Sequence, residues 1–563
     1  MKTYTRDPIA VNLSQLLIFI SILIIGSNNY LNYLALVSST ILLILAGLLL
    51  VINLDYEKKL MIERRFLTEI VIITELSLTP LIYFLLTHNL FMLLYYPLIL
   101  FGYFFKKMKY TALIMLLTLP LFYLPLNHYF GTDEIMIGYY SAYLFLHGFN
   151  PYNPHLTANV YEVFSRVDQY IRVDQYIYGT PYTTGGFVTN LNYPALFFLI
   201  ELPAVIFSFS PDYILLLFYL LTGLVMLLVL PEYLGLLFIS AYLLNFNYLY
   251  YPLGGVDDIV WVFFLLLTFL VKDVRLKGVF YGLSISYKQD PILALPFILF
   301  ILGKEKSKVF LVYAITVFLI INSYFIFLSP YYYFHDLTTP ISSNIIPIGY
   351  GITTFSFTGL FYIYPLFFTI APLTVFVLGI ILRVTNKWPA IAYFTMFLMS
   401  RVLWNYLVYW PFFSYVEINE EKKFSYNRKS TLNILGISIL FLIFLTMFFH
   451  FSFLQYSNSI HMELIKVFTK NNQVYGFLLN VSYIAYYGMP SAIKPNFRIL
   501  QDVPTISGNG LIWLSNTTVL KPGEYEIVYV YAPFPQFYLN EPVFITINAY
   551  YGDVNGFLPI SLK

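Results

Sequence analysis

Long apolar runs, broken by short polar stretches, fill most of the chain as far as residue 454. A helix that crosses a bilayer needs about 20 consecutive apolar residues. Five apolar runs of a length suited to such helices precede the first long polar loop, at residues 10–26, 31–52, 67–87, 90–105 and 110–127. This pattern predicts a mainly α, polytopic bundle of transmembrane helices.

The charged residues between the runs predict the orientation of the bundle. Lys and Arg prefer the cytoplasmic side of a membrane, so the basic loops should lie inside. They are Lys58 to Arg65, Lys106 to Lys109, Lys272 to Lys277, Lys304 to Lys308, Arg383 to Lys387 and Lys422 to Lys429. With a cytoplasmic N-terminus, the alternation of spans then brings the adjacent carboxylates of Asp133 and Glu134 to the outer face of a multi-pass cell-membrane protein.

Three later apolar segments are too short for ordinary crossings. Residues 193–209 are interrupted by proline and glutamate, which predicts an interfacial or re-entrant segment. Residues 278–302 and 388–415 each begin and end beside basic loops, yet two full crossings need about 40 residues, so each should enter the membrane and return. Their turns carry Lys288 and Arg401. A charge inside a membrane is costly unless it is paired, which makes both cations candidates for function.

The pattern changes towards the C-terminus. Residues 431–454 predict a last transmembrane helix, and the chain beyond it shows short alternating stretches such as Glu524 to Tyr531 between turn signals. We expect residues 455–563 to form an extracytoplasmic, β-sandwich-like domain. The membrane part divides into a four-span extension over residues 1–109 and a core over residues 110–430, with an outer loop at residues 128–192.

Composition narrows the range of functions. Of the 563 residues, 59% are hydrophobic and only 11% are charged, which is typical of an integral membrane protein. The net charge is +2 without a long basic run, so the chain lacks the clustered Lys and Arg that nucleic-acid binding requires. The absence of Cys excludes disulfides, thiolate nucleophiles and Cys-ligated metals. Any catalysis would therefore depend on carboxylates, His, Lys, Arg or Tyr.

The core carries a series of polar motifs. In chain order they are Thr132-Asp133-Glu134, Gly148-Phe149-Asn150-Pro151-Tyr152, Asn192-Tyr193-Pro194-Ala195-Leu196, Gly254-Gly255-Val256-Asp257, Gly282 to Pro291 and Asn405 to Pro411. In this order and sidedness, residues 110–415 resemble GT-C-type membrane glycosyltransferases, which take sugars from polyprenyl phosphates. Ala195 stands where that family has a second proline, and the four early spans and the β domain depart from it. The composition is typical of an archaeal or other prokaryotic chain.

The resemblance implies transfer of a hexose of the mannose or glucose class from a polyprenyl or dolichyl phosphate to a glycan, lipid or protein acceptor. Transfer would occur on the outer face, among the membrane lipids, with inversion at the anomeric carbon. Such chemistry needs a base for the acceptor hydroxyl and a cation for the departing phosphate. We expect Asp133, or else Glu134, to be the base, and Lys288 and Arg401 to bind the donor phosphate.

Other polar residues of the core are candidates for substrate binding. They are Tyr139, Asn150, Tyr152, Tyr193, Asp257, Asp258, Gln289, Asn405 and Tyr409. Asp257 or Asp258 could also hold a divalent cation such as Mg²⁺ or Mn²⁺, although such ions usually need more oxygen ligands than one pair.

Each assignment has a structural alternative. Asp133 could cap the helix that Glu134 continues, Lys288 could snorkel to the interface or pair with Asp290, and Asp257 and Asp258 could form a solvated turn. Two other functions remain open, a transporter or flippase of lipid-linked glycans and a surface-anchored assembly protein of the cell envelope. A transporter should show inverted repeats, and none is evident in the sequence.

Overall fold

The computed structural model describes most of the chain, in several stretches. These are residues 4–26, 33–51, 53–55, 58–123, 133–153, 191–342, 351–352, 355, 367–403, 405–419, 459–486, 489–501, 511–532, 535, 538–540, 543–551 and 554–562. The predicted last transmembrane helix at residues 431–454 and most of the predicted outer loop lie outside the described residues.

The five predicted apolar segments before the outer loop are helical. They form α1 (Pro8–Gly26), α2 (Tyr33–Leu49), α3 (Lys58–Thr87), α4 (Tyr95–Phe104), which follows the 3-10 turn η1 (Leu90–Leu94), and α5 (Met108–Tyr123). Two short strands, β1 (Tyr4–Arg6) and β2 (Asn53–Asp55), pair antiparallel beside them. Among the described residues, four helices are long and apolar enough to cross a membrane, within Pro8–Ile25, Phe66–Thr87, Asp212–Val229 and Asp290–Leu328.

The middle of the chain forms helices of very different lengths. They are α6 (Asp133–Leu146), α9 (Leu196–Leu199), α10 (Leu202–Phe207), α11 (Asp212–Val229), α12 (Glu232–Leu244), α13 (Asn247–Leu253) and α14 (Ile259–Leu270). The segment expected to be interfacial or re-entrant is therefore two short helices with a break at Ile200 and Glu201, where proline follows. Neither helix is long enough to cross a bilayer.

The residues of both predicted hairpins form helices with irregular turns between them. The first consists of α15 (Val274–Tyr287), the 3-10 turn η4 (Asp290–Ala294) and the beginning of α16 (Leu295–Leu328). Gly303, at φ 72°, interrupts α16 at the end of this hairpin. After α17 (Pro330–Ser342) and α19 (Phe367–Ile381), the second hairpin consists of α20 (Trp388–Phe397), α21 (Asn405–Val408) and α22 (Trp410–Asn419).

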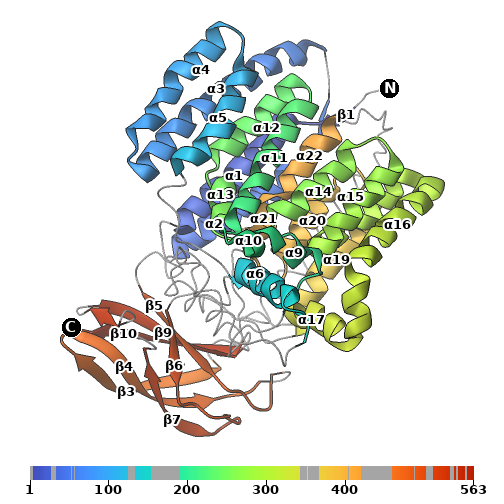
Figure 1. Ribbon diagram of the computed structural model, residues 1–563. Helices are drawn as coiled ribbons and strands as arrows, with labels where there is room; N and C mark the ends of the chain where they lie inside the picture. Colours follow the sequence, from blue (N-terminus) through green and yellow to red (C-terminus); the bar gives the residue numbers. More distant parts are fainter. Residues whose placement is uncertain are drawn as a thin grey trace.

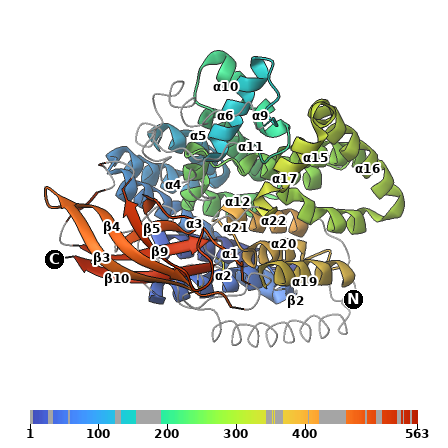
Figure 2. The same ribbon diagram turned by 90° about the horizontal axis from the view of Figure 1, so that it is seen from below.

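The C-terminal strands gather at one end of the helical body, the end at which α6, α9 and α17 also lie (Figure 1). Figure 2 looks at the molecule from this end and has the strands in front. The strands are β3 (Ile460–Lys470), β4 (Gln473–Tyr483), β5 (Asn496–Gln501), β6 (Leu511–Ser515), β7 (Tyr525–Tyr531), β8 (Leu539–Asn540), β9 (Val543–Tyr551) and β10 (Val554–Leu562). Leu500 of β5 and Tyr550 of β9 are buried in the hydrophobic core of the helices, so the two parts pack against each other.

The strands form a barrel-like sheet where we predicted a two-sheet sandwich. The strand order is β10-β9-β5-β6-β7-β4-β3, with β8 beside β4. Strand β6 joins the two halves into one sheet, because its residue Trp513 pairs with β5 while the next residue, Leu514, pairs with β7. The ends approach each other so closely that a Cβ on Gly556 of β10 would collide with the carbonyl oxygen of Ile460 in β3. The sheet thus curls around a core of its own.

Candidate functional site

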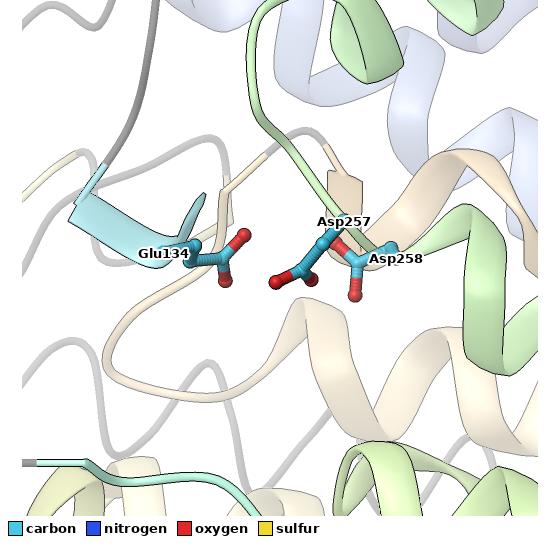
Figure 3. A group of neighbouring side chains, drawn as sticks. All are labelled: Glu134, Asp257 and Asp258. Carbon is cyan, nitrogen blue, oxygen red and sulfur yellow. The ribbon is translucent and has the colours of Figure 1, made fainter. Parts of the chain in front are cut away.

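One ammonium group lies among three carboxylates inside the helical body. Lys288 Nζ lies 2.7 Å from Asp258 Oδ1, 2.9 Å from Glu134 Oε1 and 3.3 Å from Asp257 Oδ1. The side chains are 4% exposed for Lys288, 10% for Glu134, 0% for Asp257 and 1% for Asp258. Figure 3 shows the carboxyl groups of Glu134 and Asp257 pointing toward each other, with Asp258 beside them. We call these four residues the carboxylate–lysine cluster.

Local structure explains how three distant segments supply this cluster. Glu134 lies in the first turn of α6. Asp257 and Asp258 follow a tight turn after α13, in which Gly255 has φ 75°, a conformation that glycine adopts without strain. Asp258 occupies the N-cap position of α14. Lys288 ends α15 in an extended conformation, so its side chain leaves the helix axis and reaches the carboxylates.

Neutral donors complete the hydrogen bonding of two carboxylates. The Tyr193 hydroxyl donates to Glu134 Oε1 at 2.8 Å, and the indole N–H of Trp261 donates to Asp258 Oδ1 at 2.7 Å. The Asn405 amide donates to the other oxygen of Asp258. Asp257 Oδ2, by contrast, is buried without a hydrogen-bond partner among the described residues. Asp257 is therefore the least stabilised anion of the three.

Burial and the neighbouring negative charge of Glu134 both oppose the ionisation of Asp257. Burial raises the pKa of Asp257 well above its usual value, the negative charge of Glu134 raises it further, and Lys288 offsets only part of this. The three carboxylates in turn supply the negative charge that compensates the buried ammonium group of Lys288.

Aromatic rings surround the ammonium group. Lys288 Nζ lies 5.3 Å from the centroid of the Tyr193 ring and 5.7 Å from that of Tyr406. Arg401 precedes Tyr406 by five residues in the chain. It is partly exposed and makes no ion pair with the carboxylates of the part of the chain that the structure describes.

Several predicted substrate-binding residues support the surrounding turns. Asn150 donates to the Ser329 hydroxyl at 3.1 Å, Gln289 donates to the carbonyl oxygen of Asn192 at 2.8 Å, and Tyr152 donates to the carbonyl oxygen of Tyr193 at 2.8 Å. The remaining two, Tyr139 and Tyr409, are buried. Substrate binding by these residues stays a prediction.

The structure decides between several of the alternatives. Asp257 and Asp258 are buried, so their interpretation as a solvated turn is wrong. Lys288 is 3% exposed, so it does not snorkel to an interface, and its ion pairs within the described chain are with Glu134, Asp257 and Asp258, not with the predicted partner Asp290. The side chain of Asp133, our first choice of base, lies outside the described residues, although the residue itself begins α6.

A divalent cation does not fit this arrangement well. One oxygen from each of Glu134, Asp257 and Asp258 lies within 4.8 Å of the others, a spacing that could hold a metal ion. Lys288 Nζ, however, contacts all three carboxylates and occupies the place of the shared cation. We therefore assign the role of counter-ion to Lys288 and derive no step through a metal.

Sequence reasoning missed three residues at or near the cluster. Trp261 follows Asp258 by three residues, a spacing that puts both on one side of the first turn of α14, so this partner was recognisable. Tyr406 adjoins the candidate Asn405. Glu201 is buried with both carboxyl oxygens unpartnered among the described residues and packs against Gly138, one turn from Glu134. No sequence signal distinguishes Glu201 from an interfacial carboxylate.

No protein-family model, no characterised protein and no solved structure matches the chain. The carboxylate–lysine cluster is therefore the feature from which a function can be inferred.

Proposed function

We propose that the protein is a membrane glycosyltransferase, with Glu134 as the base that activates the acceptor. It would transfer a hexose of the mannose or glucose class from a polyprenyl or dolichyl phosphate to a glycan, lipid or protein acceptor. The main support for the proposal is that residues from five motifs, far apart in the sequence, meet at one site. Glu134, Tyr193, Asp257, Lys288 and Asn405 come from five of the motifs that resemble GT-C enzymes. Together with Asp258, which directly follows the fourth of these motifs, they meet in one network of hydrogen bonds and ion pairs.

The cost of the cluster also supports a functional role. Burying charged groups costs several kcal/mol per ion even after relaxation, and an apolar core of similar volume is often as stable or more so. Ionisable groups within a membrane protein are therefore by default candidates for function. Glu134 is the most exposed carboxylate of the three, at 10%, so it is the one that a substrate hydroxyl can reach most directly.

The proposed reaction is a single displacement. Glu134 takes the proton of the acceptor hydroxyl as the acceptor oxygen forms its bond to the anomeric carbon. The bond between that carbon and the phosphate oxygen breaks, and the lipid phosphate leaves with the electron pair. Tyr193 and Lys288 hold Glu134 in place, and Arg401, which has no carboxylate partner among the described residues, offers its charge to the leaving phosphate.

Orientation follows from the same proposal. The N-terminus and the basic loops would be cytoplasmic, and α6 would lie at the outer face together with the C-terminal β domain. In support, α6 and the strands lie at the same end of the molecule (Figure 1).

The test is sugar transfer in membranes that contain the full-length protein. Polyprenyl phosphates carrying labelled mannose or glucose are supplied, and movement of label to other membrane components is measured. Glu134→Gln should lower the rate by about 10²- to 10⁴-fold, the usual contribution of a general base. Glu305→Gln is the matched control, because Glu305 is 78% exposed. Wild-type transfer rates in Glu134→Gln, or no transfer of either sugar by the wild-type protein, would overturn the proposal.

A further inference from the structure

An asparagine is buried in the longest apolar helix, outside the carboxylate–lysine cluster. Asn322 lies in α16, within a candidate membrane span of mean hydropathy 2.3, and it is 0% exposed. A polar amide buried in such a helix is costly unless its hydrogen bonds are satisfied. The burial of this amide among apolar neighbours is therefore explained only if its hydrogen-bond partners are found nearby.

The amide of Asn322 uses its full hydrogen-bonding capacity. Its Oδ1 accepts from the backbone N–H of Ala195 at 2.8 Å and from the Tyr333 hydroxyl at 2.8 Å. Its Nδ2 donates to the carbonyl oxygen of Phe318 at 2.8 Å and to the Ser286 hydroxyl at 3.3 Å. The N–H of Ala195 can only donate, so it settles which amide atom is the oxygen.

These bonds hold the turn that carries Tyr193. Asn322 holds this turn at Ala195, and the Tyr152 hydroxyl holds it at the carbonyl oxygen of Tyr193. The Tyr193 side chain then donates to Glu134 at 2.8 Å. Its ring also stacks on Phe197, with ring centroids 4.1 Å apart. Ala195 and Tyr193 therefore connect Asn322, near the end of α16, to the proposed base Glu134.

We propose that Asn322 is a positioning residue, which acts on Glu134 by fixing the Tyr193 hydroxyl. The expected effect on the reaction rate rests on the proposed glycosyl transfer. The expected effect on the contact between Tyr193 and Glu134 does not. Asn322 itself touches no part of the carboxylate–lysine cluster through any hydrogen bond of the described residues. Loss of the hydrogen bond from the Ala195 N–H would allow the turn to move, and the Tyr193 hydroxyl would then no longer point at Glu134.

The structural consequence can be measured without sugar transfer. A 3-fluorotyrosine at position 193 of the full-length protein, in detergent micelles, reports on the environment of this phenol by ¹⁹F NMR. Asn322→Ser should shift or broaden the resonance in the same way as Glu134→Ala, because both remove the ordered hydrogen bond between the Tyr193 hydroxyl and the side chain at position 134. Tyr324→Phe in the same helix is the control, since Tyr324 is 58% exposed. A resonance unchanged by Asn322→Ser would overturn the inference, whatever the enzymatic activity.

The kinetic consequence distinguishes positioning from general stability. Asn322→Ser should lower kcat about 10- to 100-fold with little change in KM, because small displacements of reacting groups lower rates by such factors. In a Tyr193→Phe background the same substitution should have less than about a 3-fold effect, since the two residues act in series. Asn322→Asp, whose neutral carboxyl keeps the acceptor oxygen and one donor, should retain a higher kcat than Asn322→Ser. Independent effects of the two substitutions would refute the proposed route through Tyr193.

If the wild-type protein moves no sugar, the proposed function fails while the ¹⁹F measurement still decides the role of Asn322. If sugar transfer is found but the resonance does not respond, the positioning role alone fails.

Discussion

Removal of the Lys288 charge is the most direct test of the carboxylate–lysine cluster as a buried ion network. In Lys288→Met the side chain keeps a similar length but loses the ammonium group that contacts three carboxylates. The three carboxylates would then remain buried together without a cation. We therefore expect a large loss of stability.

The magnitude follows from the burial of the partners. Removing one partner of a buried ion pair typically costs about 3–5 kcal/mol, because the remaining charge stays buried and uncompensated. The three carboxylates here are at most 10% exposed, which places the substitution within that range. The Trp261 indole and the Tyr193 hydroxyl still donate to Asp258 and Glu134, so we expect about 4 kcal/mol, not a larger value.

The assay is equilibrium unfolding of the purified protein in mixed micelles, followed by tryptophan fluorescence. Trp261 is a local reporter, since it donates a hydrogen bond to Asp258. Lys308→Met is the control, because Lys308 is 63% exposed and pairs only with the exposed Glu305 among the described residues, so the loss should stay below about 1 kcal/mol.

Neutralising a carboxylate should compensate part of the loss. Asp258→Asn in the Lys288→Met background should recover about 1–3 kcal/mol relative to the sum of the single changes. A loss below about 1 kcal/mol in Lys288→Met, or one equal to that of Lys308→Met, would refute the view that the cluster is a buried ion network.

Three further substitutions test other parts of the structure. Gly138→Ala should destabilise the protein by about 1–3 kcal/mol, measured by the same unfolding assay, because the new methyl group would collide with the buried carboxyl of Glu201. Burial raises the pKa of Asp336 from 3.8 to about 6, so its favourable contribution is complete below about pH 4 and is lost as the pH rises through 6. The Tm of the wild type should therefore fall relative to that of Asp336→Asn between pH 4.5 and 7. Gly556→Ala should increase hydrogen exchange in β3 and β10 more than Gly476→Ala does, because the first methyl group meets a backbone carbonyl and the second a movable tyrosine ring.

Clear outcomes would contradict each of these expectations. A Gly138→Ala protein as stable as the wild type would mean that α6 and α10 do not approach this closely. A Tm difference between wild type and Asp336→Asn that does not depend on pH would show that Asp336 does not titrate in this range. Equal hydrogen exchange in the two glycine variants would argue against the close approach of β3 and β10.

The helical segments and the candidate residues were predictable from local properties of the sequence. Apolar runs of sufficient length form helices wherever lipid or core surrounds them, because the backbone must satisfy its own hydrogen bonds there. The same logic identified Lys288 and the Asp257–Asp258 pair, since charged residues in or beside apolar segments are unusual. The short segment at residues 193–209 was also recognised as too short to cross.

Only the tertiary structure decided which of these residues meet. Glu134 and Lys288 are 154 residues apart in the chain, and hydropathy carries no information about such a contact. The burial of Asp257 and Asp258 likewise depends on the packing of the turn after α13 among other helices. From the sequence alone, a pair of adjacent acidic residues predicts an exposed turn. The barrel-like β sheet depends on β6, one strand divided between two neighbours, which alternation along single strands does not predict. Local periodicity thus determined the elements, while long-range packing determined which charges were buried together.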